Sequence, residues 1–219
     1  WHPAVAPGTV AMALRSTGAW SLDGPRRRFD SEDWWYRTRF DLDPGVSPDQ
    51  VRLGLDGLGT VCEAWLNGRL ILRSENMFLA HVLQDLPVRA GANELCLVFR
   101  SLDHWLQRKR PRPRWRTPMV ENQQLRWART TVLGRTPGWS PPVAAVGPWR
   151  PVWLEVSSEC TLAVEGIHTS LKRGVGRISL SADLRGRLPS DLRLVASAGG
   201  NRLSSAPATA DGGKVRVEL

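Results

Sequence analysis

The chain has 219 residues, 42% of them hydrophobic, and a formal net charge of +9. This length suits one large or two modest globular domains, and we expect two. No apolar run approaches the roughly 20 residues that cross a bilayer, and no secretory signal precedes the first predicted strand, so we expect a soluble protein of unknown compartment. Cys62, Cys96, Cys160 and four scattered histidines lack the spacing of a metal site, and we expect neither a metal nor a cofactor.

Alternating apolar and polar residues predict β-strands through the first part of the chain. In chain order the expected strands are residues 36–42, 51–55, 60–66, 69–72, 94–100 and 152–156. The pair Asn67-Gly68 favours a tight type I′ turn between the third and fourth strands. Helical periodicity is weak, and it predicts one helix, at residues 102–109. We therefore expect the first domain, residues 1–157, to be an antiparallel β-sandwich.

Residues 110–148 form a long connection with seven prolines and no predicted strand. Loops of this length usually carry function or pack against another domain. From Trp105 to Arg129 the chain holds eight basic residues, one acid and interleaved tryptophans, a composition that binders of single-stranded nucleic acid share. Because the prolines exclude a helix interior, we favour an interpretation in which arginine side chains stack over tryptophan faces.

Aromatic residues end at Trp153: all eleven Trp, all four Phe and the single Tyr lie in residues 1–153. Beyond this point, short strands separated by glycines are expected at residues 161–169, 177–184, 192–197 and 215–219. An immunoglobulin-like sandwich needs about 100 residues, whereas about 60 follow Cys160. We expect the second domain, residues 158–219, to be a truncated immunoglobulin-like β-sandwich.

Three motifs occur in order along the first domain. They are Asp33-Trp34-Trp35-Tyr36-Arg37-Thr38-Arg39-Phe40, then Leu55-Asp56-Gly57-Leu58-Gly59-Thr60-Val61-Cys62-Glu63-Ala64-Trp65-Leu66-Asn67-Gly68, then Gly147-Pro148-Trp149-Arg150-Pro151-Val152. Together they resemble family 2 glycoside hydrolases, over residues 14–157. The resemblance implies an N-terminal jelly-roll, galactose-binding-like domain, followed in that family by an immunoglobulin-like domain and a catalytic (β/α)8 barrel.

Within that family the chain is most similar to the β-mannosidase type, through Asn76-Met77-Phe78 and Trp139-Ser140-Pro141. Around the position of Trp139-Ser140-Pro141 those enzymes carry Trp-Asp-Trp-Gly-Pro. The resemblance implies that the aspartate of this motif reaches the sugar in the barrel. This chain has Pro137-Gly138-Trp139-Ser140-Pro141, so Trp139 matches the second Trp and Gly138 stands in place of the aspartate. We expect no carboxylate contact from this position, and the sequence leaves the sugar and the linkage open.

The candidate substrate-binding residues all lie in the long loop. They are Trp139, Glu121, Asn122, Gln123, Gln124 and Arg126. Trp139 offers a flat apolar surface for a sugar ring, and the four polar residues offer donors and acceptors to hydroxyls. Arg126 matches an arginine that precedes this loop in the family, and it could hold a sugar hydroxyl or an acidic residue of the barrel. Each residue also has a structural alternative. Trp139 could anchor the loop, the four polar residues could form hydrogen bonds with the loop backbone, and Arg126 could form an ion pair between domains.

Retaining glycoside hydrolysis needs two carboxyl groups about 5 to 5.5 Å apart, and the sequence shows no such pair. The resemblance implies that both catalytic glutamates lie in the barrel, which this chain does not contain. We therefore expect the non-catalytic N-terminal portion of a β-mannosidase-like enzyme, inactive alone, with carbohydrate and the barrel as partners and neither nucleic acid nor a membrane. A free-standing carbohydrate-binding module and a basic nucleic-acid-binding domain are the two alternatives.

Overall fold

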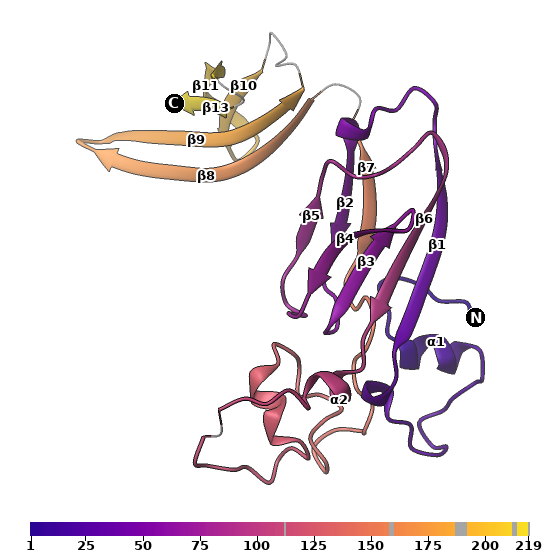
Figure 1. Cartoon of the computed structure of the whole chain (residues 1–219). Helices are drawn as coiled ribbons and strands as arrows, with labels where there is room; N and C mark the ends of the chain where they lie inside the picture. The colour runs from indigo at the N-terminus through magenta and orange to yellow at the C-terminus, as the bar shows by residue number, and fades with distance from the viewer. Residues whose placement is uncertain (112, 158–159, 187–191, 212–213, 219) are drawn as a thin grey trace. The chain divides into compact units, whose positions relative to one another are not determined.

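The computed structural model describes residues 1–111, 113–157, 160–186, 192–211 and 214–218. Contacts divide the chain into two compact units, Trp1–Val156 and Ser157–Leu219, which are described one at a time. Both units are built from antiparallel strands, and the helices are short (Figure 1). The all-β fold class expected from the sequence is therefore confirmed.

Two antiparallel sheets form the first unit, with strand orders β1-β6-β3-β4 and β5-β2-β7. Their strands are β1 (Trp34–Leu42), β2 (Val51–Leu55), β3 (Cys62–Leu66), β4 (Arg69–Ser74), β5 (His81–Leu83), β6 (Gly91–Phe99) and β7 (Val152–Val156). The long strands β1 and β6 pair along their whole length, from Trp34 opposite Phe99 to Leu42 opposite Gly91. Residues 67 and 68 join β3 to β4 with φ angles of 51° and 79°, the positive values of the predicted type I′ turn.

The core of the first unit lies between its two sheets. Successive side chains of a strand point to opposite faces of the sheet, so the alternating apolar residues of the sequence gather on the inner faces. β2 and β6 supply many of the buried side chains, including Val51, Leu53, Leu55, Leu95, Leu97 and Phe99. Removal of this apolar surface from water is the main force that holds the two sheets together.

The helices differ in part from the prediction. α2 (Leu102–Trp105) lies inside the predicted range, whereas α1 (Val10–Ser16) was not predicted. Thr9 caps α1, because its hydroxyl accepts a hydrogen bond of 3.3 Å from the Met12 N–H. Seven residues are too few for a helical period to stand out in the sequence. The described residues of this unit also form the 3-10 helices η1 (Phe29–Ser31), η2 (Pro48–Gln50) and η3 (Gln123–Trp127).

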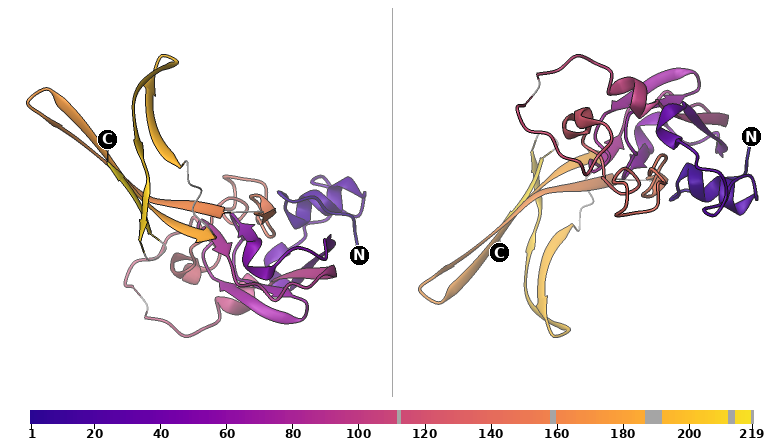
Figure 2. Two further views of the ribbon diagram at one scale, coloured as in Figure 1. Left: turned by 90° about the horizontal axis from the view of Figure 1, so that it is seen from above. Right: turned by 90° about the horizontal axis from the view of Figure 1, so that it is seen from below.

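The second unit contains a four-stranded sheet of order β12-β13-β9-β8 and a separate β10–β11 hairpin. The strands are β8 (Cys160–Lys172), β9 (Val175–Gly186), β10 (Arg193–Ala198), β11 (Asn201–Pro207), β12 (Thr209–Asp211) and β13 (Lys214–Glu218). The long β8–β9 hairpin and the β10–β11 hairpin point in different directions (Figure 2). β11 and β12 were not predicted, and residue 219 of the last predicted strand lies outside the described residues.

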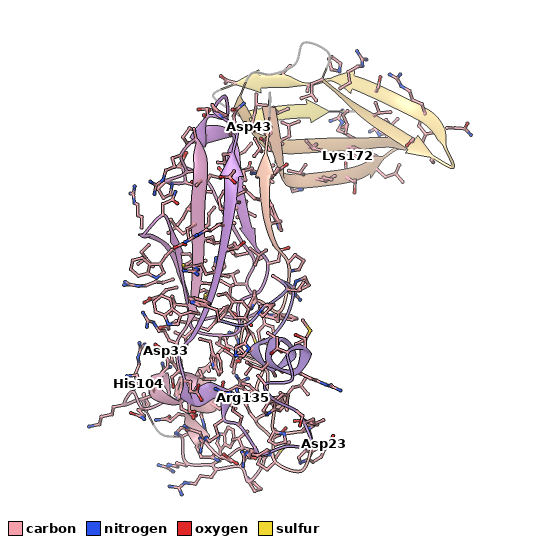
Figure 3. The ribbon with its side chains drawn as sticks, turned by 90° about the vertical axis from the view of Figure 1, so that its right-hand side faces the viewer. Asp23, Asp33, Asp43, His104, Arg135 and Lys172 are labelled. Carbon is pink, nitrogen blue, oxygen red and sulfur yellow. The ribbon has the colours of Figure 1, made fainter. Side chains whose placement is uncertain are left out.

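The two ends of the first sandwich carry different segments. Asp33 precedes β1 and Asp43 follows it, and these two residues lie at opposite ends, with His104 and Arg135 near Asp33 (Figure 3). α2 and the long loop that follows it gather at the same end (Figure 1). This end of the sandwich, which we call the Asp33 end, therefore holds the candidate residues of the sequence analysis.

Candidate functional site

The 3-10 helix η3 organises the first part of the long loop. Asn122 caps it, since its side-chain oxygen accepts a hydrogen bond of 2.9 Å from the Gln124 N–H. The side chain of Gln123 both accepts from the Thr117 N–H at 3.1 Å and donates to the Thr117 carbonyl at 2.7 Å. The amide side chains of residues 122 and 123 are therefore engaged with the backbone of the loop itself.

Arginine side chains stack on tryptophan rings in the same region. The guanidinium of Arg126 lies 4.2 Å from the centre of the Trp115 ring, while its Nε donates to a backbone carbonyl of η3 at 2.7 Å. Arg108 and Arg110 cover Trp105, with guanidinium carbons 5.4 and 3.9 Å from the ring centre. The stacking interpretation of this basic segment therefore holds for these three arginines.

Trp105 anchors the loop to the sandwich. It is 5% exposed, and its Nε1 donates a hydrogen bond of 2.9 Å to Glu75, which follows β4. Together with Leu102 and Leu106 it forms a small apolar cluster that includes Leu125 of η3. Because α2 and η3 share this cluster, the two short helices hold each other in place at the Asp33 end.

Trp139 stands out from the loop into solvent, with an exposed fraction of 77%. Its N–H donates to the Thr136 carbonyl at 3.2 Å and so closes a turn in which Gly138 has a φ of 81°. Glycine adopts this conformation without strain. An added Cβ at Gly138 would meet no atom within 4 Å. The turn therefore leaves open space at Gly138 and presents one large aromatic ring beside it.

Glu121 has an ion-pair partner that the sequence analysis did not identify. Arg26 donates from Nη2 to Glu121 Oε1 at 2.9 Å. The hydrogen bond and the charge of Arg26 hold the pKa of Glu121 below its ordinary value, so this carboxylate is ionised at neutral pH. The run of three arginines at 26–28 was the available signal, and Arg27 and Arg28 pair with Glu32 and Asp103, both at 3.1 Å.

A buried ion pair joins the loop to η1. Arg135 donates from Nε and Nη2 to the two carboxylate oxygens of Asp30, each at 2.7 Å. The two side chains are only 7% and 13% exposed. A third hydrogen bond of 2.8 Å runs from Arg135 Nη1 to the Thr131 carbonyl. This arginine therefore ties the turn before Trp139 both to its own loop and to the segment before β1.

Of the six predicted residues, Glu121 alone lies in the wall of a small cavity that the described residues form, which we call the Glu121 cavity. It has a volume of about 200 Å³, and its walls include Arg26, Glu121, Arg135 and Gly138. Asn122 lines a neighbouring cavity of about 80 Å³. Among the described residues, those in the walls of the two cavities do not include Gln123, Gln124, Arg126 or Trp139.

A larger groove lies elsewhere on the first unit. It has a volume of about 680 Å³, between the N-terminal arm with α1 and the strands β1 and β6, and Trp1, Tyr36 and Leu97 are among its lining residues. The described residues in its walls do not include any of the predicted site residues. Burial raises the pKa of Tyr36 well above its ordinary value, so its hydroxyl stays neutral at physiological pH.

The lowered pKa values of the Asp33 and Glu63 carboxyl groups suit ion pairing and not proton donation. Burial alone would raise the pKa of Asp33, but hydrogen bonds from Arg100 and from the Ser101 N–H lower it. The Arg100 hydrogen bond likewise lowers the pKa of Glu63. A catalytic acid needs a raised pKa instead. The described residues also include no cluster of three or more His, Cys, Asp or Glu that could hold a metal, and none of their helices is long and apolar enough to cross a membrane.

Comparison with known proteins gives consistent results. The family model described as the glycosyl hydrolase 2 galactose-binding domain-like family matches residues 1–150. Beta-mannosidase B of Thermothelomyces thermophilus is 32% identical over 166 residues, which cover 69% of this chain and 18% of that protein. Beta-mannosidase of Mus musculus is 28% identical over 170 residues, which cover 70% of this chain and 19% of that protein. The chain thus spans less than a fifth of the length of these two relatives.

Solved structures share the fold. The beta-D-mannosidase of Dictyoglomus thermophilum matches 100% of this chain with 28% of its own, at a TM-score of 0.69 and 22% identity. The exo-chitosanase of Amycolatopsis orientalis matches 100% of this chain with 25% of its own, at a TM-score of 0.60 and 17% identity. At such identities the likeness concerns the fold alone. Because the family model covers more than half of the residues, and the three sequence motifs lie largely within that match, the chain belongs to the glycosyl hydrolase 2 galactose-binding domain-like family.

Proposed function

We propose that this chain is the non-catalytic N-terminal portion of a glycoside hydrolase that acts on β-linked sugars and is of the β-mannosidase type. Its role is to support and shape one side of the active site of a catalytic (β/α)8 barrel. The observation that carries the proposal is the Asp33 end, where a loop fixed by the buried Asp30–Arg135 pair presents the exposed ring of Trp139. A rigid support with an aromatic surface is what a sugar-binding rim requires.

The candidate residues divide into two roles under this proposal. Trp139 stacks on a sugar ring, because its flat apolar face matches the C–H face of a pyranose, and Glu121 accepts from hydroxyls. Asn122, Gln123 and Arg126 hold the shape of the loop, since their polar groups bind its own backbone and the Trp115 ring. Gln124 adds its N–H to the cap of η3.

We further propose a β-mannoside as the sugar. The support is the name of the curated relatives, which are beta-mannosidases at 32% and 28% identity. Gly138 supplies no carboxylate at the position where the family resemblance places one. Recognition of the sugar by this chain therefore falls to Trp139 and to groups around the Glu121 cavity.

The test compares aryl β-mannosides with aryl β-glucosaminides as substrates of the whole protein that carries this chain. Trp139→Ala is expected to raise KM for the preferred substrate about tenfold, a typical loss for one aromatic stacking contact, and the 219-residue chain alone is expected to show no turnover. Trp35→Ala is the matched control, because Trp35 is also exposed, at 53%, but lies on β1. Turnover by the chain alone, or an unchanged KM in the Trp139 variant, would contradict the proposal.

A further inference from the structure

We infer that Arg26 and Glu121 form a subsite for a neutral, hydroxyl-bearing ring such as a pyranose, in the Glu121 cavity. This inference rests on the proposed function and names the chemical class of ligand that the loop accepts. The cavity volume of about 200 Å³ lies below the range usual for drug-sized ligands. A single small ring is therefore the size of ligand that fits.

The ion pair has hydrogen-bonding capacity to spare. One bond, from Arg26 Nη2 to Glu121 Oε1, joins the two groups at 2.9 Å. A guanidinium carries five N–H donors and a carboxylate offers about four acceptor positions, and the side chains are 54% and 48% exposed. Two neighbouring hydroxyls of a sugar can therefore accept from the guanidinium and donate to the carboxylate at once. Such hydrogen bonds to charged groups are stronger than those between neutral groups.

The charges around the cavity are balanced in pairs, and this balance selects a neutral ligand. Arg26 pairs with Glu121 at 2.9 Å, and Arg135 pairs with Asp30 at 2.7 Å. The described arginines in the wall of the neighbouring cavity are matched too, Arg27 by Glu32 and Arg28 by Asp103. An anionic sugar would have to compete with Glu121 for Arg26, and a cationic sugar would have to compete with Arg26 for Glu121. A polyol binds both groups without separating the charges.

The remaining walls suit a polyol as well. Gly138 leaves open space, since an added Cβ there would meet no atom within 4 Å. The hydroxyls of Thr136 and Ser140 belong to residues of the wall, and the Ser140 hydroxyl is fixed by the Gly134 N–H at 2.9 Å. A small number of placed polar groups is what fixes the orientation of a small polar ring in a binding site.

The test titrates the 15N-labelled 219-residue chain with methyl β-D-mannopyranoside, methyl β-D-glucopyranoside and the methyl glycoside of glucuronic acid. We expect saturable shifts with a neutral pyranoside in amide signals of the cavity wall, at millimolar concentrations. Glu121→Gln and Arg26→Gln are each expected to weaken this binding about tenfold or more, as for loss of a hydrogen bond to a charged group. Glu94→Gln is the matched control, because the Arg39–Glu94 pair at 3.0 Å is also exposed but lies on β1 and β6.

Three results would overturn the inference: no saturable shift with either neutral pyranoside, equal binding by the Glu121→Gln variant, or tighter binding of the uronate than of the neutral sugars. Thermal melts establish that each variant is folded, and Glu121→Asp replaces Glu121→Gln if the latter unfolds. If the titration shows no sugar binding at this subsite but Trp139→Ala still changes KM, the subsite is rejected and the proposed function is not. Sugar binding here with an unchanged KM in the Trp139 variant would reject the proposed function and leave the subsite.

Discussion

Arg135 and Asp30 are 105 residues apart in the sequence, and their guanidinium and carboxylate meet in two hydrogen bonds of 2.7 Å. Both side chains are largely removed from water, with exposed fractions of 7% and 13%. The contact connects η1, just before the first strand, with the turns that lead to Trp139. This polar contact therefore helps to fix the position of the long loop.

Loss of one partner of this pair should be costly, because the other charge would remain buried without compensation. We expect Asp30→Asn to lower the free energy of unfolding by about 3 kcal/mol, measured by urea denaturation. The double variant Asp30→Asn with Arg135→Met should recover part of this loss. Glu32→Gln removes the exposed pair with Arg27 and should cost at most about 1 kcal/mol. An effect of Asp30→Asn no larger than that control would show that the pair does not hold the loop.

Stability should also depend on pH through Arg100, which binds Asp33 at 2.8 Å and Glu63 at 2.7 Å. The pKa values of both carboxyls are lowered in the folded state, so the unfolded chain binds more protons in acid. The stability that they contribute is therefore complete above their ordinary pKa values, near about 4. It is lost as the pH falls through the lowered values of the folded state.

The variant Arg100→Gln should remove much of this dependence. We expect the difference in free energy of unfolding between about pH 7 and about pH 3 to be smaller in this variant than in the parent chain. Urea denaturation at the two pH values measures it. Because both carboxylates are partly exposed, at 40% and 19%, screening by water limits the size of the effect. Equal pH dependence in the two proteins would mean that Arg100 does not lower these pKa values.

The sandwich could be predicted because its strands alternate with period two over five or more residues. Residues 51–55 and 152–156 were predicted with the bounds that β2 and β7 have in the structure. β5 has three residues, which are too few for an alternation to be detected. α1 has seven residues, which are too few for a helical period to be detected. Short elements depend on contacts with the rest of the fold, and a local pattern does not carry that information.

The candidate site could be placed in a loop but not assembled from the sequence. The proline-rich interval and Trp139 were visible as local features. Arg26 and Asp30 were missed because their partners, Glu121 and Arg135, are 95 and 105 residues away. Ion pairs between distant residues depend on how the chain returns to the Asp33 end. A run of three arginines favours ion pairs with carboxylates and does not show which carboxylates form them.

Gly54 should not tolerate a side chain. It pairs with Trp153 across β2 and β7, and an added Cβ would overlap the Trp153 ring. That ring is held by a hydrogen bond of 3.1 Å from its Nε1 to Asp56. We expect Gly54→Ala to lower the free energy of unfolding by about 1–3 kcal/mol, the usual range for overpacking. Gly45→Ala is the control, because its Cβ would meet nothing within 4 Å, and equal stabilities of the two variants would contradict the prediction.

Two tryptophans at the Asp33 end should respond differently to truncation. Trp105 is 5% exposed and Trp139 is 77% exposed. We expect Trp105→Ala to lower the free energy of unfolding by about 3–5 kcal/mol, because it leaves a cavity beside α2 and removes the donor to Glu75. Trp139→Ala should stay within about 0.5 kcal/mol of the parent chain.

Urea denaturation of both variants decides the point. A large loss in the Trp139 variant would mean that its ring helps to fold the loop, and a change in KM on its removal would then have a structural cause. A small loss, together with a large one for Trp105, would show that the ring of Trp139 is separable from the support beneath it. In that case, an altered KM in the Trp139 variant reports contact between this ring and the sugar.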